Sequence, residues 1–371
     1  MKKIITILGA RPQFIKASAV SAVIAASNQL KEIVVHTGQH FDADMSDFFF
    51  AELGMQKPSY HLDIHGGGHG EMTGRMLIEI EKVLLAENPD VVMVYGDTNS
   101  TLAGALAAAK LHIPVAHVEA GLRSFNMAMP EEINRILTDR ISQWLFTPTE
   151  AAADHLLREG VAAQKIAPVG DVMFDVALQQ GARALAQGGI LDKLAVQNGI
   201  QAGTYCLATI HRAENTDNPA RLAAIVEALT VFSRETPVIW PLHPRTRGVL
   251  VQQEKLKVLA QSVTLIDPVG YLDMVQLEKH AAVIATDSGG VQKEAFFYKV
   301  PCVTLRNETE WVELVEAGWN RLAPPLNAAA VLAALRASRG SHGAEVAPYG
   351  QGDAAQRIVQ RLQNDFATKV W

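Results

Sequence analysis

The sequence predicts an α/β protein with two doubly wound parallel sheets. Short apolar runs recur along the chain, and amphipathic or Ala-rich helical stretches such as residues 101–112 lie between them. The runs are apolar on both faces, as strands of a parallel sheet must be when helices cover it. Strands that alternate with helices in this way are typical of βαβ units. The length of 371 residues favours about two to three domains.

The apolar runs form two series. The first predicts strands at residues 4–9, 32–38, 90–97, 114–120, 144–149 and 165–170. The second follows a segment rich in Ala, Gly and Gln and predicts strands at residues 205–210, 237–243, 263–268, 282–290 and 301–307. We expect domains at 1–172 and 173–352, a junction near 171–176, and a final helix at 353–371. Two such domains are expected to face each other across a cleft, with ligands at the carboxyl ends of the strands.

Composition excludes several classes of protein. Apolar residues make up 49% of the chain and charged residues 19%, which describes a well-buried protein. The net charge of −6 offers no basic footprint, so nucleic acid is not an expected partner. The apolar part of MKKIITILGARPQ is too short for a signal peptide, and no run approaches the ~20 residues of a membrane span. Cys206 and Cys302 lie in apolar runs. We therefore expect both to be buried free thiols and the protein to be cytoplasmic.

Polar residues gather where the predicted strands end. These residues are Arg11, Gln39 and His40, Asp97, Glu119, His211 and Arg212, His243, and Asp287 to Gly290. Because carboxyl ends of parallel strands share one edge, carboxylates, arginines and histidines are expected to lie together there. An active cleft and an ordinary solvated rim are both compatible with this pattern.

The segment TDSGGVQKEAFF, residues 286–297, is the clearest phosphate signal. A strand ends, two glycines allow a tight turn, and a helix begins, so backbone N–H groups and the helix dipole suit a diphosphate. Ser288 either caps this helix or bonds a ligand oxygen, and Glu294 lies where ribose hydroxyls are in reach. His243 leads HPRTR, whose Arg245 and Arg247 are expected to neutralise the diphosphate. An ordinary Ser–Gly–Gly turn is the alternative.

Several cofactor signatures are missing. The chain contains neither GxGxxG nor GxxxxGK[ST], so the dinucleotide fingerprint and the P-loop are absent. The DAD at 42–44 sits at an expected helix start, where aspartates act as caps. The two cysteines, Cys206 and Cys302, do not have the spacing of a metal site. We therefore expect no metal and no redox cofactor.

Five linked motifs together resemble a known family. They are GARPQFIK (9–16), YGDTNSTLAGALAA (95–108), HVEAGLR (117–123), PEEINR (130–135) and TDSGGVQKE (286–294). In order and spacing they are similar to the non-hydrolysing UDP-N-acetylglucosamine 2-epimerases along nearly the whole chain. This resemblance implies the GT-B fold, a terminal helix that crosses back to the first domain, a UDP-sugar substrate and a homodimer.

The resemblance also implies site residues. The catalytic carboxylates fall on Asp97, Glu119 and Glu131. The nucleotide-sugar contacts fall on Arg11, Lys16, His211, Ser288, Gly289, Gly290 and Glu294, with Arg135 as a further candidate. Strand-end position adds Arg212 and His243 to the binding residues.

Two departures from the family pattern indicate a branch. Gln13 stands where Glu is usual and Trp311 where Arg is typical. Both variants resemble enzymes acting on UDP-2,3-diacetamido-2,3-dideoxyglucuronate, which make the mannuronate epimer for surface polysaccharide such as O-antigen. A neutral Gln13 in the cleft would repel a uronate less than Glu. The missing Arg argues the other way on charge.

Carbon 2 of a hexose is hard to invert because its hydrogen is barely acidic. Without a nicotinamide fingerprint, the remaining route eliminates UDP to a glycal and adds it back. This route needs a gripped diphosphate, carboxylates on both faces of the sugar, and closure against water. Arg123 and Arg135 are expected to orient the carboxylates, whereas Glu132 is expected to be a solvated helix-start acid. The alternatives are a UDP-N-acetylglucosamine 2-epimerase, a hydrolysing epimerase, a UDP-dependent glycosyltransferase and a non-catalytic nucleotide-sugar sensor.

Overall fold

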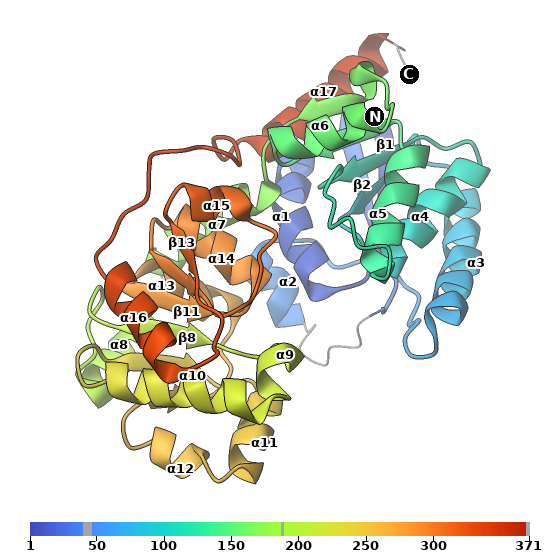
Figure 1. Cartoon of the computed structure of the whole chain (residues 1–371). Helices are drawn as coiled ribbons and strands as arrows, with labels where there is room; N and C mark the ends of the chain where they lie inside the picture. The colour runs from blue at the N-terminus through green and yellow to red at the C-terminus, as the bar shows by residue number, and fades with distance from the viewer. Residues whose placement is uncertain (40–46, 187–188, 369–371) are drawn as a thin grey trace. The chain divides into compact units, whose positions relative to one another are not determined.

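The structure is a computed structural model that describes residues 1–39, 47–186 and 189–368. The chain divides into two compact units. Unit 1 comprises Met1–Val176 and Ala347–Trp371, and unit 2 comprises Ala177–Val346. The aspartates at 42 and 44 and His40 lie outside the described residues. Each unit is a parallel sheet covered by helices (Figure 1).

Unit 1 contains a seven-stranded sheet in the order β3-β2-β1-β4-β5-β6-β7, with every recorded pairing parallel. The strand order reverses beside β1, as in a doubly wound sheet. The strands are β1 (Lys2–Leu8), β2 (Leu30–His36), β3 (Tyr60–His61), β4 (Val91–Tyr95), β5 (Val115–Val118), β6 (Trp144–Thr147) and β7 (Ile166–Pro168).

Helices cover both faces of this sheet. They are α1 (Arg11–Ala25), α2 (Asp47–Leu53), α3 (His69–Glu87), α4 (Asn99–Lys110), α5 (Pro130–Ile141), α6 (Glu150–Arg158), a 3-10 turn (Ala163–Lys165) and α17 (Ala354–Thr368). Helix α4 lies between α3 and α5 (Figure 1). The alternate strand residues Ile5, Ile7, Val92 and Val94 face α3 and α4 in one apolar cluster. Each such buried side chain contributes about 1.5–3 kcal/mol.

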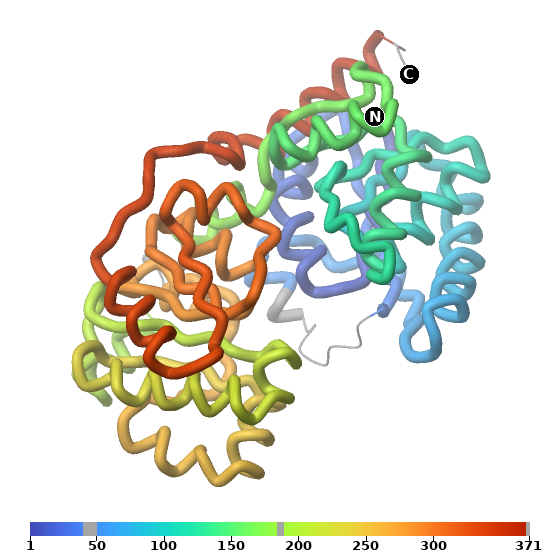
Figure 2. Tube along the Cα trace, in the orientation of Figure 1, coloured from blue at the N-terminus to red at the C-terminus, as the bar shows by residue number. Residues whose placement is uncertain are grey.

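The C-terminal helix belongs to unit 1. Figure 2 traces the chain from unit 2 back to α17, which packs against α1. Trp144 donates its indole N–H to Asp365 at 2.7 Å, and Gln363 bonds Ser27 at 2.9 Å. The start of α17 is held by Asp175, whose carboxylate accepts from the N–H groups of Ala354 and Ala355. The last helix of the chain therefore completes the fold of unit 1.

Unit 2 repeats the plan with six parallel strands in the order β10-β9-β8-β11-β12-β13. They are β8 (Cys206–Thr209), β9 (Val238–Pro241), β10 (Thr264–Ile266), β11 (Val283–Thr286), β12 (Cys302–Thr304) and β13 (Asn320–Leu322). Cys206 and Ala208 of β8 pack toward the cluster under α10 and α16, whereas Leu207 packs toward α13 and α14. The sheet is therefore buried on both faces, as its continuous apolar runs predicted.

The helices of unit 2 alternate with its strands, and α8 precedes the first of them. They are α8 (Ile190–Asn198), α9 (Ala213–Thr216), α10 (Pro219–Phe232), α11 (Pro244–Gln252), α12 (Leu256–Leu259), α13 (Tyr271–Lys279), α14 (Gly289–Phe297), α15 (Val312–Glu316) and α16 (Ala328–Ser338). The connecting helix α7 (Val172–Ala186) starts in unit 1 and ends in unit 2. The predicted facing of two domains across a cleft stays a prediction.

Candidate active site

The predicted residues of unit 1 follow the three central strands or lie on the adjoining helices. Asp97 comes two residues after β4, and Glu119 directly follows β5. Arg11 opens α1 and Lys16 lies one turn further along it, while Glu131 and Arg135 lie on α5. Because β1, β4 and β5 are neighbours in the sheet, these segments meet at one edge.

Asp97 is held by Arg135. The guanidinium donates from Nε at 2.9 Å and from Nη2 at 2.6 Å to the same oxygen, Oδ2. Asn134, one residue earlier on α5, donates to the backbone carbonyl of Asp97 at 2.9 Å. The Asp97 side chain keeps 31% of its surface exposed. The structure thus brings together a predicted acid and a predicted cation, and leaves the acid accessible.

Glu119 is paired with Lys16 and held in an unusual backbone conformation. The Lys16 ammonium donates directly to Glu119 Oε2, and the Glu119 side chain is only 8% exposed. Burial alone would lower the pKa of Lys16, but the Glu119 carboxylate overcomes that effect, so the pKa rises. Glu119 has φ of +72°, a left-handed value that costs a non-glycine residue about 1–2 kcal/mol. Such strain persists only where surrounding contacts enforce it.

Glu132 corrects one expectation. It was expected to be solvated, but it is 1% exposed. Its carboxylate accepts from the N–H groups of Ser124 and Phe125 at 2.9 Å each, and from Arg135 at 2.9 Å. Burial would raise the pKa of Glu132, but these donors outweigh it and lower the pKa. Glu132 therefore shapes the loop before α5, whereas Glu131, one residue earlier, is half-buried at the helix start.

Gln13 also differs from expectation, because it is a buried brace and not a cleft residue. It is 3% exposed. Its Oε1 accepts from the Gly9 N–H at 2.8 Å, and its Nε2 donates to the Tyr95 carbonyl at 2.7 Å and to Thr101 at 3.0 Å. The amide therefore ties the turn after β1 to the end of β4. The charge argument linking Gln13 to a uronate substrate loses its basis.

Gln39 and Arg123 are engaged in unit 1. Gln39 accepts from the N–H and hydroxyl of Ser100 at 2.9 and 2.7 Å. Arg123 was expected to orient the catalytic acids, and it donates instead to Asp139 at 2.7 Å and to Glu159 at 2.7 and 2.8 Å. Its side chain is 1% exposed.

In unit 2, a buried acid gathers the residues that follow β8. Asp287, just after β11, is fully buried. It accepts from the N–H of His211 at 3.1 Å, from the N–H of Arg212 at 3.1 Å and from Asn215 Nδ2 at 3.0 Å. The His211 ring lies 6.0 Å from the ring of His243. Burial is the main reason that the pKa of His211 falls below its ordinary value, and His243 adds to it.

The turn at the start of α14 is flanked by a cation and an indole. A Cβ on Gly289 would meet Arg212 Nη2 at 3.6 Å and Trp311 Nε1 at 3.8 Å. Trp311 donates this N–H to the Gly289 carbonyl at 2.9 Å, and the Lys293 ammonium lies 4.3 Å from the indole centroid. Arg212 thus reaches the predicted diphosphate turn, and Trp311 fixes its backbone.

The two roles considered for Ser288 are separated by geometry. Ser288 is the N-cap residue of α14, but within the described chain its side chain makes no capping bond. Gly290 follows it in the first turn of the helix. Glu294 lies one turn further along α14 and is 9% exposed.

The two arginines of the basic segment after β9 pair with local acids. Arg245 pairs with Asp217 at 2.7 Å, and Arg247 pairs with Asp267 at 2.7 Å. His243 caps α11, because its Nδ1 accepts from the Arg245 N–H at 3.2 Å. The charges of Arg245 and Arg247 are therefore balanced by local acids and not held for a diphosphate.

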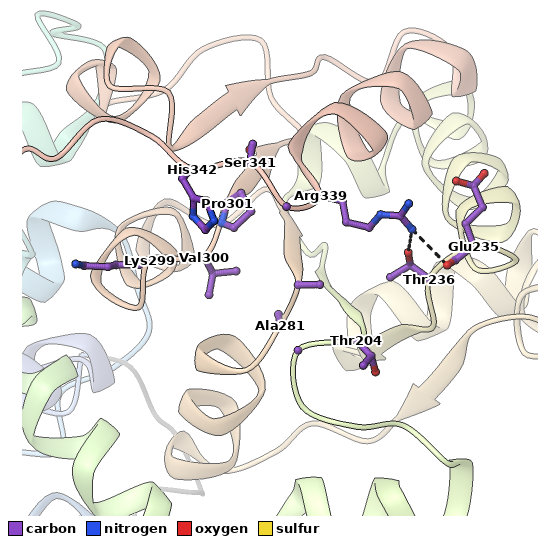
Figure 3. Close-up of a pocket in the computed structure, with 13 residues that line it drawn as sticks. Thr204, Glu235, Thr236, Ala281, Lys299, Val300, Pro301, Arg339, Ser341 and His342 are labelled. Atoms are coloured by element: carbon purple, nitrogen blue, oxygen red, sulfur yellow. Dashed lines mark hydrogen bonds between the residues drawn. The ribbon is translucent and has the colours of Figure 1, made fainter.

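A hollow of about 450 Å³ in unit 2 lies away from these residues (Figure 3). Thr204, Thr236 and Pro301 line it, and each comes just before a strand. Arg339 crosses it to donate to Thr236 and to the Glu235 carbonyl. Ligands of doubly wound sheets bind at the carboxyl ends of strands, so this amino-terminal hollow is not the candidate site.

Among residues 1–39, 47–186 and 189–368, no group of three or more His, Cys, Asp or Glu side chains is placed to hold a metal ion. None of the helices in this part of the chain combines the length and apolarity needed to cross a membrane.

Two Rossmann-like units with polar residues at the carboxyl ends of their strands define a protein of the GT-B class. A family model described as UDP-N-acetylglucosamine 2-epimerase matches residues 22–363. The chain belongs to this family of isomerases. The predicted fold class and family are therefore confirmed.

Individual relatives cover almost the full chain. A Pseudomonas aeruginosa protein named UDP-2,3-diacetamido-2,3-dideoxy-D-glucuronate 2-epimerase is 57% identical over 97% of this chain and 99% of its own. The Escherichia coli UDP-N-acetylglucosamine 2-epimerase is 33% identical over 98% of this chain and 99% of its own. The crystal structure of the Methanocaldococcus jannaschii UDP-GlcNAc 2-epimerase in complex with UDP-GlcNAc and UDP gives a TM-score of 0.84 at 46% identity, covering 98% of this chain and 100% of that one.

Proposed function

We propose that the protein epimerises UDP-2,3-diacetamido-2,3-dideoxy-D-glucuronate at carbon 2, giving the mannuronate epimer for O-antigen or a similar surface polysaccharide. The observation that carries this substrate is the 57% identity to a relative of that name. A relative named UDP-N-acetylglucosamine 2-epimerase homolog is 51% identical, and relatives named UDP-N-acetylglucosamine 2-epimerase are 33–46% identical. The main alternative is UDP-N-acetylglucosamine, converted to UDP-N-acetylmannosamine, because those relatives also align over nearly the whole chain.

The proposed reaction proceeds by elimination and re-addition. The bond between carbon 1 and the diphosphate oxygen breaks, and UDP leaves with the electron pair. A carboxylate takes the proton from carbon 2, and the electrons of that C–H bond form the double bond of a glycal. An acid then protonates carbon 2 from the opposite face while UDP adds back to carbon 1. The hydrogen at carbon 2 moves as a proton and no step transfers a hydride, so this route needs no nicotinamide.

Unit 1 supplies the acid–base groups in this proposal. Asp97, Glu119 and Glu131 are the catalytic carboxylates, and general acid–base catalysis by such groups is worth about 10²–10⁴-fold. Arg135 and Lys16 orient Asp97 and Glu119 through the ion pairs described above. Arg11, at the start of α1, adds positive charge for the substrate.

Unit 2 supplies the leaving-group site in this proposal. The N–H groups of Gly289 and Gly290 at the start of α14 receive the diphosphate, and the Ser288 hydroxyl bonds an oxygen. Arg212 and His211 stabilise the charge that develops as UDP departs. His243 lies against His211, and Glu294 receives the ribose hydroxyls.

Solvent exchange tests the chemistry. The protein is incubated in deuterated water with the diacetamido-glucuronate substrate and, in parallel, with UDP-N-acetylglucosamine. We expect one deuterium at carbon 2 of the recovered UDP-sugar, a mixture of both epimers, and faster exchange with the uronate. Exchange with UDP-N-acetylglucosamine alone would make that sugar nucleotide the substrate in place of the uronate. Free UDP without epimer would indicate a hydrolase, and no deuterium with either would refute epimerisation.

Amide variants test the residues. Asp97→Asn, Glu119→Gln and Glu131→Gln should each lower the exchange rate by about 10²-fold or more while UDP still binds in calorimetry. Glu150→Gln, which changes an exposed acid at the start of α6, is the matched control and should retain full exchange. Normal exchange in all three variants would refute the assignment.

We propose a homodimer built on the helical face of unit 1. Exposed apolar side chains lie on α3, at Ile78 and Leu85, and on α5, at Ile133 and Leu137. Light scattering should give twice the 40.2 kDa chain mass, and Leu85→Glu with Leu137→Glu should give monomer. Leu157→Glu, an equally exposed leucine on α6, is the control. A monomeric wild type would overturn the proposal.

We propose that the protein is cytoplasmic and that its functional domains are residues 1–172 with the helix 353–371, and residues 173–352. Cys206 and Cys302 support the location, because both are buried free thiols. Burial raises the pKa of Cys302 to about 12, which keeps the thiol inert. Epimerase activity should follow the cytosolic fraction of broken cells, and activity in a periplasmic or membrane fraction would contradict the location.

A further inference from the structure

A buried histidine and aspartate lie beneath the two ion-paired carboxylates of unit 1. His117 on β5 is fully buried, and Asp139 on α5 is 2% exposed. The His117 ring bonds in two directions. Its Nδ1 lies 2.7 Å from Asp139 Oδ1, and its Nε2 lies 2.8 Å from the carbonyl oxygen of Gly96. Gly96 is the residue directly before Asp97, so the ring reaches the backbone that carries this acid.

The second oxygen of Asp139 reaches the other acid-bearing loop. Asp139 Oδ2 accepts from the Gly121 N–H at 3.1 Å and from Arg123 Nη1 at 2.7 Å. Gly121 is two residues after Glu119. One carboxylate on α5 is therefore connected to both loops, directly to the segment after β5 and through His117 to the segment after β4.

The two loops also contact each other, and each contains a residue in the left-handed conformation. The Gly96 N–H donates to the Val118 carbonyl at 3.0 Å. Gly96 has φ of +61° and Glu119 has φ of +72°. A left-handed residue that is not glycine needs contacts that over-determine its backbone. The bonds from Asp139 provide such contacts on both sides of the strained segment.

Donors surround the Asp139 carboxylate closely enough to rule out a role as a proton acceptor. Burial would raise the pKa of Asp139, but His117 and Arg123 outweigh it and lower the pKa. Neither His117 nor Asp139 is accessible to a sugar, since both are buried. Their bonds lead to the backbone of the acids and not to a ligand.

We propose that His117 and Asp139 are positioning residues that fix the separation of the Asp97 and Glu119 carboxylates for proton transfer at carbon 2. This inference rests on the proposed function. A displacement of about 1 Å at a reacting group can cost about 10²-fold in rate without loss of binding. The pair should therefore affect kcat far more than KM.

Two substitutions at His117 separate positioning from a merely structural role. Asn places its amide near the position of Nδ1, so His117→Asn keeps the bond to Asp139 and loses the bond to Gly96. Gln reaches the position of Nε2, so His117→Gln keeps the bond to Gly96. Both remove the ring and leave a comparable gap. His36→Asn, which changes a buried histidine on β2 of the same sheet, controls for stability.

Wild-type deuterium exchange at carbon 2 is measured first, so failure of the proposed function is recognised before any variant is compared. We then expect His117→Asn to lower kcat by about 10²-fold, and His117→Gln by about tenfold or less. For both, KM and the Kd for UDP should stay within about threefold of wild type. His36→Asn should keep the wild-type kcat.

Equal losses of kcat in His117→Asn and His117→Gln, or an unchanged kcat in His117→Asn, would overturn the proposal. If His117→Asn does not fold, Asp139→Asn provides the test, because it keeps the shape of the side chain and replaces one acceptor oxygen by an NH2 donor. It should lower kcat by about tenfold at unchanged UDP affinity. A kcat within twofold of wild type in folded Asp139→Asn would then refute positioning.

Discussion

Replacing Asp287 by Ala should detach the loop that follows β8 and weaken UDP binding. Asp287 is fully buried and accepts from two backbone N–H groups, of His211 and Arg212, and from the Asn215 amide. No other strand-end acid of unit 2 described here connects β11 to β8 in this way. The loop carries both residues proposed to stabilise the departing diphosphate.

The magnitude follows from the donors left behind. A hydrogen bond to a charged group contributes about 1.5–3 kcal/mol, and three bonds to one carboxylate are not additive. Water can enter beside the half-exposed His211 and satisfy part of the loss. We therefore expect a fall of about 3–4 kcal/mol in the free energy of unfolding. Disorder of the loop should weaken UDP binding by about 10–100-fold, or about 1.4–2.7 kcal/mol.

Urea unfolding and calorimetric titration with UDP measure the two effects. Asp267→Ala is the matched control, because Asp267 also follows a strand of unit 2 but its side chain is 89% exposed in an ion pair with Arg247. Asp267→Ala should change the free energy of unfolding by no more than about 0.5 kcal/mol. If Asp287→Ala binds UDP as tightly as Asp267→Ala does, the loop does not depend on Asp287 and the reasoning is wrong.

Three further predictions use matched pairs or a pH series. Gly121→Ala should lower the free energy of unfolding by clearly more than the cost of a left-handed non-glycine residue, which is about 1–2 kcal/mol, because its Cβ would lie 2.3 Å from the Ala152 carbonyl oxygen. Gly160→Ala is the control, since Gly160 has the same φ of +79° but open space around its Cβ position. Equal losses for the two variants in urea unfolding would contradict this reasoning. Trp311→Phe loses the indole bond to Gly289 and should weaken UDP binding about fivefold, whereas Trp319→Phe loses a similar bond to Ala344 and should leave calorimetry unchanged. Burial raises the pKa of Asp175 to about 6, so its contribution to stability is fully present below about pH 4 and is lost as pH rises through 6. The free energy of unfolding of Asp175→Asn should therefore rise by up to about 3 kcal/mol relative to that of the wild type between pH 4 and pH 7.5. A constant difference between the two proteins across that range would disprove the raised pKa.

The central strands were predictable because they are buried on both faces. The runs at 90–97 and 205–210 contain β4 and β8, whose residues are nearly all inaccessible to solvent. The edge strands β3 and β13 were missed. They have two and three residues and expose part of their side chains, so no apolar run marks them. An apolar run in the sequence marks a strand whose side chains are buried, and the side chains of these short edge strands are only partly buried.

The place of the candidate carboxylates in the fold was predictable, but their ion-pair partners were not. Strand-end location placed Asp97 and Glu119 at one edge. Their cations are 38 and 103 residues away along the chain, at Arg135 and Lys16, and no local pattern links them. Arg245 shows the opposite error, since a basic cluster in sequence suggested a phosphate site. Its charge is balanced by Asp217, an acid 28 residues earlier that only folding brings close.

The number of donors around each buried acid separates acids that shape the site from acids able to exchange a proton. Glu132 accepts from two backbone N–H groups and Arg135. Asp139 accepts from one backbone N–H group, His117 and Arg123. In both acids the pKa is lowered. A carboxylate stabilised in this way is a poor base. Asp97 differs, because both arginine bonds reach one oxygen, Oδ2, and its side chain is partly exposed. In the adjacent pair at the start of α5, the same reasoning assigns loop structure to Glu132 and is compatible with the proposed proton transfer by Glu131, a division that residue type alone could not make.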